Sequence, residues 1–146
     1  MSEIIETGGG TVLGNLTLSS GGTGTLTGSG SGLQLGSGTT AGKFTNAGTL
    51  TDNTTAGSDS LYLTSKSVFN NQGSYTLSPQ SAGIYSDGPL DVMNNSGTFT
   101  VNGGTGTDTY IYPTFNNSGT VNVSSGTLTL GEYAGTATQS GSFNLA

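Results

Sequence analysis

The chain has 146 residues, of which 7% are charged and 30% are hydrophobic, and its formal net charge at pH 7 is −6. It contains no Cys, His, Trp or Arg, which excludes a disulfide framework, a zinc site built from Cys and His, and catalysis by an imidazole or a thiolate. With only two Lys it is a poor partner for nucleic acid and for anionic membranes, because both are bound largely through basic side chains.

An eight-residue motif recurs along the chain and sets its organisation. The clearest copies are Phe44–Thr51, Phe69–Thr76, Met93–Thr100 and Phe115–Asn122, and weaker copies are Gly24–Thr27 and Gly141–Asn144. The glycines of these copies lie at positions 24, 48, 73, 97, 119 and 141, so the period is 22 to 25 residues. A period that drifts in this way is typical of stacked coils joined by loops of variable length. We therefore expect one domain, residues 1–146, with no helix of consequence.

Each predicted coil holds three short strands, which we call A, B and C. In chain order, a B strand is expected near residues 3–5, a C strand at 11–13, an A strand at 15–18 and the next B strand at 25–27. Further C strands are expected at residues 33–35, 61–63, 84–85, 110–112 and 128–130, and A and B strands in the two halves of each motif copy. Strands this short form no stable sheet alone, but stacked in parallel roughly 4.8 Å apart they bury one continuous core. The sequence therefore predicts an all-β parallel β-helix of about six coils.

Three columns of side chains follow from this register. Apolar residues on either side of each glycine are predicted to point inward and to stack from coil to coil: Phe44, Phe69, Met93 and Phe115 in the A strands, and Leu26, Leu50, Tyr75, Phe99, Val121 and Phe143 in the B strands. A third column lies at the turn between strands A and B and consists of Asn46, Asn71, Asn95 and Asn117. We expect this column to be a structural ladder, in which stacked amides hydrogen-bond to one another and to turn carbonyls.

The B strands also predict an outward face. Because side chains alternate across a strand, the residues that flank the inward column point to solvent in two parallel rows. The threonines in these rows are Thr25, Thr27, Thr49, Thr51, Thr76, Thr98, Thr100 and Thr120. Rows of this kind resemble the ice-binding faces of antifreeze proteins, although Thr is also the favoured residue of any exposed strand face. Ice binding is therefore one hypothesis for this surface.

Both ends of the predicted solenoid are open. Ile4 and Ile5 lie in the B strand at one end, Phe143 and Leu145 lie in the B strand at the other, and no amphipathic helix covers either. An uncapped end is an unpaired edge, and a head-to-tail contact that does not close generates a filament. We therefore expect the main partner of the chain to be a second copy of itself.

A family resemblance supports this interpretation. The pattern Asn-Asn-Ser-Gly-Thr followed by an apolar residue, at residues 94–99 and 116–121, and Ser-Gly-Thr-Leu-Thr-Leu at 125–130 resemble the parallel β-helix repeats of filamentous-haemagglutinin-like adhesins and autotransporter passenger domains. The resemblance implies a right-handed parallel β-helix in a secreted or surface-displayed structural module. We expect a non-enzymatic, self-assembling fibre unit at the cell surface or outside the cell. Adhesion to carbohydrate or to another surface is the alternative.

Carboxylates are the one feature that invites an enzymatic interpretation. Asp87, Asp91 and Asp108 lie in or near the C-strand loops of adjacent coils, where a pair could perform acid–base chemistry or bind calcium, but solvated loop residues are the simpler interpretation. Lys43 and Lys66 are isolated in the sequence, so no cationic site accompanies these carboxylates. We expect no catalytic activity, no cofactor and no metal. No apolar run approaches the length of a membrane span, so we also expect no membrane insertion.

Overall fold

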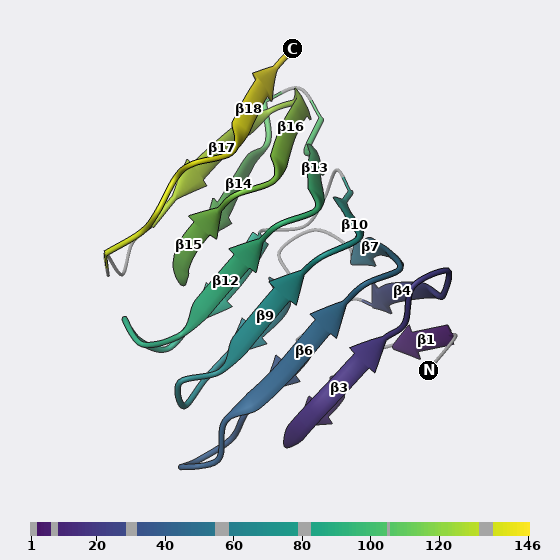
Figure 1. The fold of residues 1–146 in the computed structure, drawn as a ribbon, viewed down its shortest axis with the longest axis vertical. Helices are drawn as coiled ribbons and strands as arrows, with labels where there is room; N and C mark the ends of the chain where they lie inside the picture. Colours follow the sequence, from purple (N-terminus) through teal and green to yellow (C-terminus); the bar gives the residue numbers. More distant parts are fainter. Residues whose placement is uncertain are drawn as a thin grey trace.

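The computed structural model describes residues 3–6, 9–28, 32–54, 59–78, 83–104, 106–131 and 136–146, with the backbone alone for residues 3–6 and 59. Within these residues the chain forms eighteen β-strands and no helix. The strands wind into a parallel β-solenoid of about five turns with three strands per coil, so that each coil lies on the one before it (Figure 1). The predicted fold class is confirmed.

The B strands form a seven-stranded sheet, which we call the threonine sheet. Its strands, in spatial order, are β1 (Glu3–Glu6), β4 (Thr23–Gly28), β7 (Thr49–Thr54), β10 (Ser74–Leu77), β13 (Thr98–Asn102), β16 (Thr120–Ser125) and β18 (Ser142–Leu145). Every neighbouring pair in it is parallel, and Leu50, Tyr75 and Phe99 lie directly opposite one another. The predicted inward column of the central B strands is therefore confirmed.

The C strands form a six-stranded sheet, which we call the tyrosine sheet. Its strands, in spatial order, are β17 (Thr127–Leu130), β14 (Asp108–Ile111), β11 (Gly83–Ser86), β8 (Asp59–Leu63), β5 (Leu33–Leu35) and β2 (Thr11–Val12). The A strands form the third, five-stranded sheet, which we call the asparagine sheet. It consists of β15 (Thr114–Asn117), β12 (Val92–Asn95), β9 (Val68–Asn71), β6 (Gly42–Asn46) and β3 (Gly14–Leu18).

The three sheets enclose one apolar core, because alternate residues of every strand point toward the axis. Phe44, Phe69, Tyr75 and Phe99 are fully buried in it. The ring centroids of Phe44 and Phe69 are 5.4 Å apart, those of Phe69 and Tyr75 are 5.3 Å apart, and Tyr75 stacks on Phe99 at 5.3 Å. Aromatic pairs of this kind stabilise a core by about 0.5–1.5 kcal/mol each beyond the area they bury. The aromatic columns of two sheets therefore interlock along the axis.

Glycine is required at the corner between the asparagine and threonine sheets. A column of register glycines occupies this corner: Gly48, Gly73, Gly97, Gly119 and Gly141. A Cβ atom on any of them would overlap the carbonyl oxygen of the glycine one coil below. Successive coils approach one another so closely here that no side chain fits between them. This close approach explains why the glycines mark the period of the sequence.

The register of the first coil differs from the prediction. Gly22, and not Gly24, lies beneath Gly48, and the amide of Thr49 donates to the carbonyl oxygen of Gly22 at 2.9 Å. Gly24 therefore pairs with Leu50, and Leu26 lies two residues further along the strand, opposite a buried aspartate. The cause is a corner of four residues, 19–22, where later coils have only two. Because the shift is an even number of residues, Leu26 still points inward and is buried.

The solenoid has about five turns and not six, because the last A strand does not form. Residues 136–140 contain neither the Phe nor the paired Asn of the motif, and all of them are exposed. They contribute one isolated bridge, between Asn117 and Gln139, before the chain enters β18. With no inward apolar side chain to bury, this segment follows the coil below without building a strand of its own.

Candidate interaction surfaces

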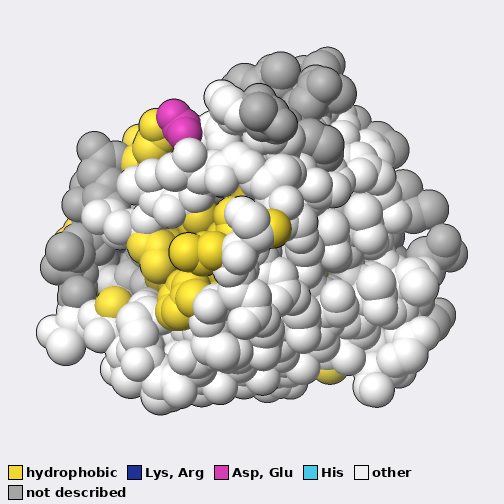
Figure 2. Space-filling view, turned by 90° about the horizontal axis from the view of Figure 1, so that it is seen from above, with side chains coloured by type: hydrophobic (Ala, Val, Ile, Leu, Met, Phe, Trp, Pro, Cys, Tyr) yellow, Lys and Arg dark blue, Asp and Glu magenta, His cyan; other side chains and the backbone are white. Residues whose placement is uncertain are grey.

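The C-terminal end of the solenoid exposes core side chains. Figure 2 views this end, where hydrophobic side chains gather in a central patch. Leu130 is 36% exposed, Phe143 is 39% exposed and Leu145 is 77% exposed. These residues lie in β17 and β18, and among the described residues each of these strands has a strand neighbour on one side only. We call these two strands the C-terminal edge and call β1, β2 and β3 the N-terminal edge.

The predicted residues of the opposite end lie in β1. The backbone of Ile4 pairs with Gly24 and that of Ile5 pairs with Thr25, so both belong to the outermost strand of the threonine sheet. Their side chains lie outside the described part of the chain. The two outermost strands of the threonine sheet, β1 and β18, are therefore both B strands.

The predicted threonines lie on the outward face of the threonine sheet, although the register of the first coil is shifted by two residues relative to the prediction. One row consists of Thr23, Thr49, Ser74, Thr98, Thr120 and Ser142, and the other of Thr25, Thr51, Thr76, Thr100, Asn122 and Asn144. Thr27 lies beyond both rows, opposite Asn53. Of the eight predicted threonines, Thr49 is exposed and the other seven are half-buried. The face is therefore regular but only partly open to solvent.

The asparagine ladder is buried. Asn46 donates from Nδ2 to Oδ1 of Asn71 at 2.8 Å, Asn71 donates to Asn95 at 2.7 Å, and Asn95 donates to Asn117 at 2.8 Å. The same Nδ2 atoms also donate to backbone carbonyls of the threonine sheet, at 2.8 Å from Asn46 to Ser74 and 2.9 Å from Asn71 to Thr98. All four amides are at most 1% exposed, so the ladder is a structural element, as predicted.

A second amide row, which the sequence analysis did not single out, follows the outer face of the same strands. Asn94 donates to Oδ1 of Asn70 at 2.9 Å, and Asn116 donates to Oδ1 of Asn94 at 2.9 Å. These side chains are half-buried. The doubled Asn of the last three clear motif copies was the available signal, because adjacent residues of a strand point to opposite faces.

The tyrosines of the C strands lie on the outer face of the tyrosine sheet, outside the core. Tyr62, Tyr85, Tyr110 and Tyr112 are half-buried, whereas Leu61, Leu63, Ile84 and Ile111 between them are at most 1% exposed. Ring centroids are 4.9 Å apart for Tyr62 and Tyr85, 5.4 Å for Tyr85 and Tyr112, and 5.7 Å for Tyr110 and Tyr112. We call these four residues the tyrosine row. Their alternation with Leu and Ile was the signal that places them on the outer face.

The structure brings two of the three predicted carboxylates, Asp87 and Asp91, close enough to interact. Asp91 is buried, and it accepts hydrogen bonds from the amide of Ser67 at 2.7 Å and from Oγ of Ser86 at 2.8 Å. Burial raises the pKa of Asp91, and the nearby Asp87 carboxyl raises it further. Asp108 is exposed at the start of β14. Asp91 therefore joins two turns of neighbouring coils, and the solvated-loop interpretation is wrong for it.

A fourth aspartate, which the sequence analysis missed, lies inside the core. Asp52 is fully buried in the inward column of the threonine sheet, between Leu26 and Leu77. Its Oδ1 accepts from the amide of Thr54 at 2.9 Å and from the Thr54 hydroxyl at 2.8 Å, and its Oδ2 accepts from the Tyr75 hydroxyl at 3.2 Å. Burial raises the pKa of the Asp52 carboxyl, because the charged form loses its hydration.

Among the described residues, no three acidic side chains are arranged to hold a metal ion. No helix in this part of the chain has the length and hydrophobicity needed to cross a membrane. Comparisons with protein families, with curated proteins and with solved structures find no match to this chain.

Proposed function

We propose that this chain is a non-enzymatic structural unit that assembles end to end into an extracellular fibre. The observation that carries the proposal is the C-terminal edge, where Leu130, Phe143 and Leu145 are exposed beside strands with one neighbour each. An edge of this kind is a template for further strand pairing. The occupant we propose is the N-terminal edge of a second copy.

The register of the threonine sheet supports this pairing. Ile4 begins a backbone column that continues through Gly24, Leu50, Tyr75, Phe99 and Val121 and ends at Phe143. A second copy stacked in the same register would place its Ile4 opposite Phe143. The junction would gain parallel backbone pairing of β1 with β18 and of β2 with β17. The apolar patch would then lie inside a continuous core instead of facing water.

The geometry of this contact favours a fibre over a closed oligomer. The two edges are different surfaces, so the contact is heterologous, and a heterologous contact that does not close extends without limit. The extracellular location and the role as a fibre unit are proposed from the resemblance of the repeats to those of surface adhesins. Lack of catalytic activity is part of the same proposal.

Electron microscopy combined with light scattering tests the proposal. The unmodified chain should form filaments one solenoid wide, and Leu145→Glu should leave monomers, because it places a charge in the apolar patch. Leu90→Glu is the matched control, since Leu90 is 61% exposed on a loop at the side of the solenoid. Monodisperse monomers of the unmodified chain from acidic to neutral pH would refute the proposal. Filaments that form equally well with Leu145→Glu would refute the proposed junction.

Ice binding by the threonine sheet is a second candidate, favoured by the regular rows on its outward face. Thr76 and Thr100 lie directly opposite each other in the central part of one row. A bulky side chain there, as in Thr76→Tyr or Thr100→Tyr, should abolish thermal hysteresis while the circular dichroism spectrum stays unchanged. A concentrated solution of the unmodified chain that shows no thermal hysteresis would end this hypothesis.

A further inference from the structure

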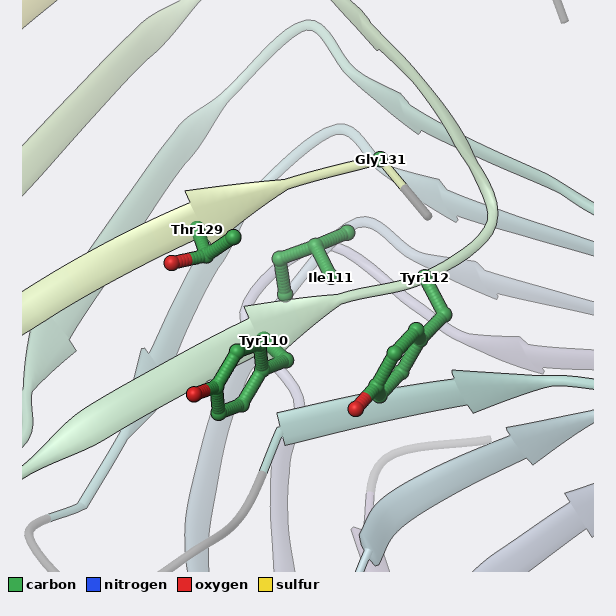
Figure 3. Close-up of a pocket in the computed structure, with 5 residues that line it drawn as sticks. All are labelled: Tyr110, Ile111, Tyr112, Thr129 and Gly131. Atoms are coloured by element: carbon green, nitrogen blue, oxygen red, sulfur yellow. The ribbon is translucent and has the colours of Figure 1, made fainter. Parts of the chain in front are cut away.

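The tyrosine row forms an aromatic strip along the solenoid axis. Three successive coils contribute Tyr62, Tyr85 and Tyr112. Tyr110 lies in β14 two residues before Tyr112, and the planes of these two rings are inclined by only 15°. In Figure 3 the rings of Tyr110 and Tyr112 lean from β14 away from β17. The ring planes of Tyr62 and Tyr85 are inclined by 50° and those of Tyr85 and Tyr112 by 60°, so the strip is a row of tilted rings in contact, each partly open to solvent.

The strip ends at a hollow. The next coil places Thr129 opposite Tyr110 and brings Gly131 level with Tyr112, so a small side chain and a glycine follow two aromatic rings. Tyr110, Ile111, Tyr112, Thr129 and Gly131 line a hollow of about 310 Å³ (Figure 3). This volume is at the lower end of the range for small-molecule sites, which is roughly 300–1,000 Å³. The hollow therefore has room for a small cyclic group against the two tyrosines.

The chemistry of this surface selects the ligand. Tyrosine rings offer an apolar face, and the hydroxyls of Tyr110, Tyr112 and Thr129 can donate and accept hydrogen bonds. Both lysines lie elsewhere, Lys43 on the asparagine sheet and Lys66 on a loop, while Asp108 is exposed on the same strand as Tyr110. Anionic ligands would therefore meet negative charge without a cation to balance it. A pyranose ring fits, because it combines an apolar face of C–H groups with a rim of hydroxyls.

We propose that the tyrosine row and the hollow at its end bind a neutral β-linked polysaccharide, with sugar rings packed against the exposed parts of the tyrosines and the chain lying along the solenoid axis. The coil-to-coil spacing of the rings, 4.9 Å and then 5.4 Å, is close to the length of one sugar residue in an extended β-linked chain. Successive sugars can therefore meet successive tyrosines. This site lies on the side of the solenoid and is independent of end-to-end assembly.

Calorimetric titration with cellohexaose and chitohexaose tests the proposal, with oligogalacturonate as the acidic comparison. Both neutral oligomers should bind, and oligogalacturonate should not. Loss of one stacking contact in Tyr112→Leu should weaken binding by roughly 3- to 10-fold, whereas Tyr112→Phe should stay within about 3-fold of the unmodified chain. Thr76→Leu, a substitution on the threonine sheet, should leave binding unchanged.

Each result decides the matter. Absence of binding to both neutral oligomers, equal affinity of Tyr112→Leu and the unmodified chain, or preference for oligogalacturonate would overturn the proposal. The same titrations with the Leu145→Glu variant separate this proposal from that of the fibre. Binding should persist there whether or not filaments form.

Discussion

The asparagine ladder allows one stability prediction to be worked out from its contacts. Asn71 is fully buried, donates to Asn95 and to the carbonyl of Thr98, and accepts from Asn46. Asn71→Ala removes these three hydrogen bonds. A hydrogen bond of this kind contributes about 1 kcal/mol net, and a buried polar atom left without its partner costs about 1–3 kcal/mol. Oδ1 of Asn95 is such an atom, so the expected loss in the free energy of unfolding is about 4 kcal/mol.

The preceding residue provides a matched control. Asn70 is the same residue type on the same strand, but it points outward, is half-buried and accepts one side-chain hydrogen bond, from Asn94 at 2.9 Å. Water can replace that bond, so Asn70→Ala should cost about 0.5 kcal/mol. Helix or strand propensity cannot account for the difference, because both substitutions replace Asn by Ala in β9.

Urea unfolding followed by circular dichroism measures both values under conditions in which the chain is monomeric. The midpoint of Asn71→Ala should fall well below that of Asn70→Ala, with similar slopes of free energy against urea. Equal losses for the two variants, or a loss below about 1 kcal/mol for Asn71→Ala, would show that the ladder does not hold the coils together.

Three further predictions use the same measurement. Thr109 Oγ1 is buried with no partner among the described residues, so Thr109→Val should stabilise the fold by about 1 kcal/mol. Thr54→Val removes a hydrogen bond to Asp52 and should destabilise the fold by about 1–2 kcal/mol. Changes of the same sign in the free energy of unfolding of the two variants would contradict this prediction. The raised pKa of Asp52 means that the carboxyl binds its proton more tightly in the folded state than in the unfolded state. The free energy of unfolding should therefore increase as the pH falls from about 7 to about 4, and Asp52→Asn should make this pH dependence weaker. A pH dependence that is the same in the variant would refute the prediction. Gly97→Ala would overlap the backbone below and should cost more than about 3 kcal/mol, whereas Gly88→Ala meets no atom within 4 Å and should change stability by less than about 1 kcal/mol.

The central coils were predictable because their sequence signals agree. Phe69, Asn71 and Gly73 each stand at a fixed distance from the next, and the structure stacks them on Met93, Asn95 and Gly97 as expected. A period of two residues in each strand then determines which side chains point inward. Handedness stays a prediction that rests on the family resemblance and on the general preference of parallel crossovers.

The ends and the outer faces were harder to predict. Two glycines stand close together at positions 22 and 24, and only the backbone contact with Gly48 shows which of them occupies the corner. The burial of Asp52 was missed because an aspartate is rarely placed in a core, and because its partner Tyr75 comes from the next coil, although its other partner, Thr54, is only two residues away. The tyrosine row was not predicted, although the alternation of Tyr with Leu and Ile along the C strands separates the two faces of this sheet.

The direction of the hydrogen bonds in the asparagine ladder has a consequence for how such a chain can change in length. Every Nδ2 of the ladder donates toward the C-terminal end, and each one is held in that orientation by a backbone carbonyl of the coil above. An inverted coil would bring two donors or two acceptors together, so each coil fits its neighbours in one orientation only. A duplicated coil in the same orientation, however, adds one amide that accepts from below and donates above. Insertion or deletion of whole repeats therefore leaves every remaining contact of the ladder satisfied, and the solenoid can lengthen or shorten in evolution without a redesigned core.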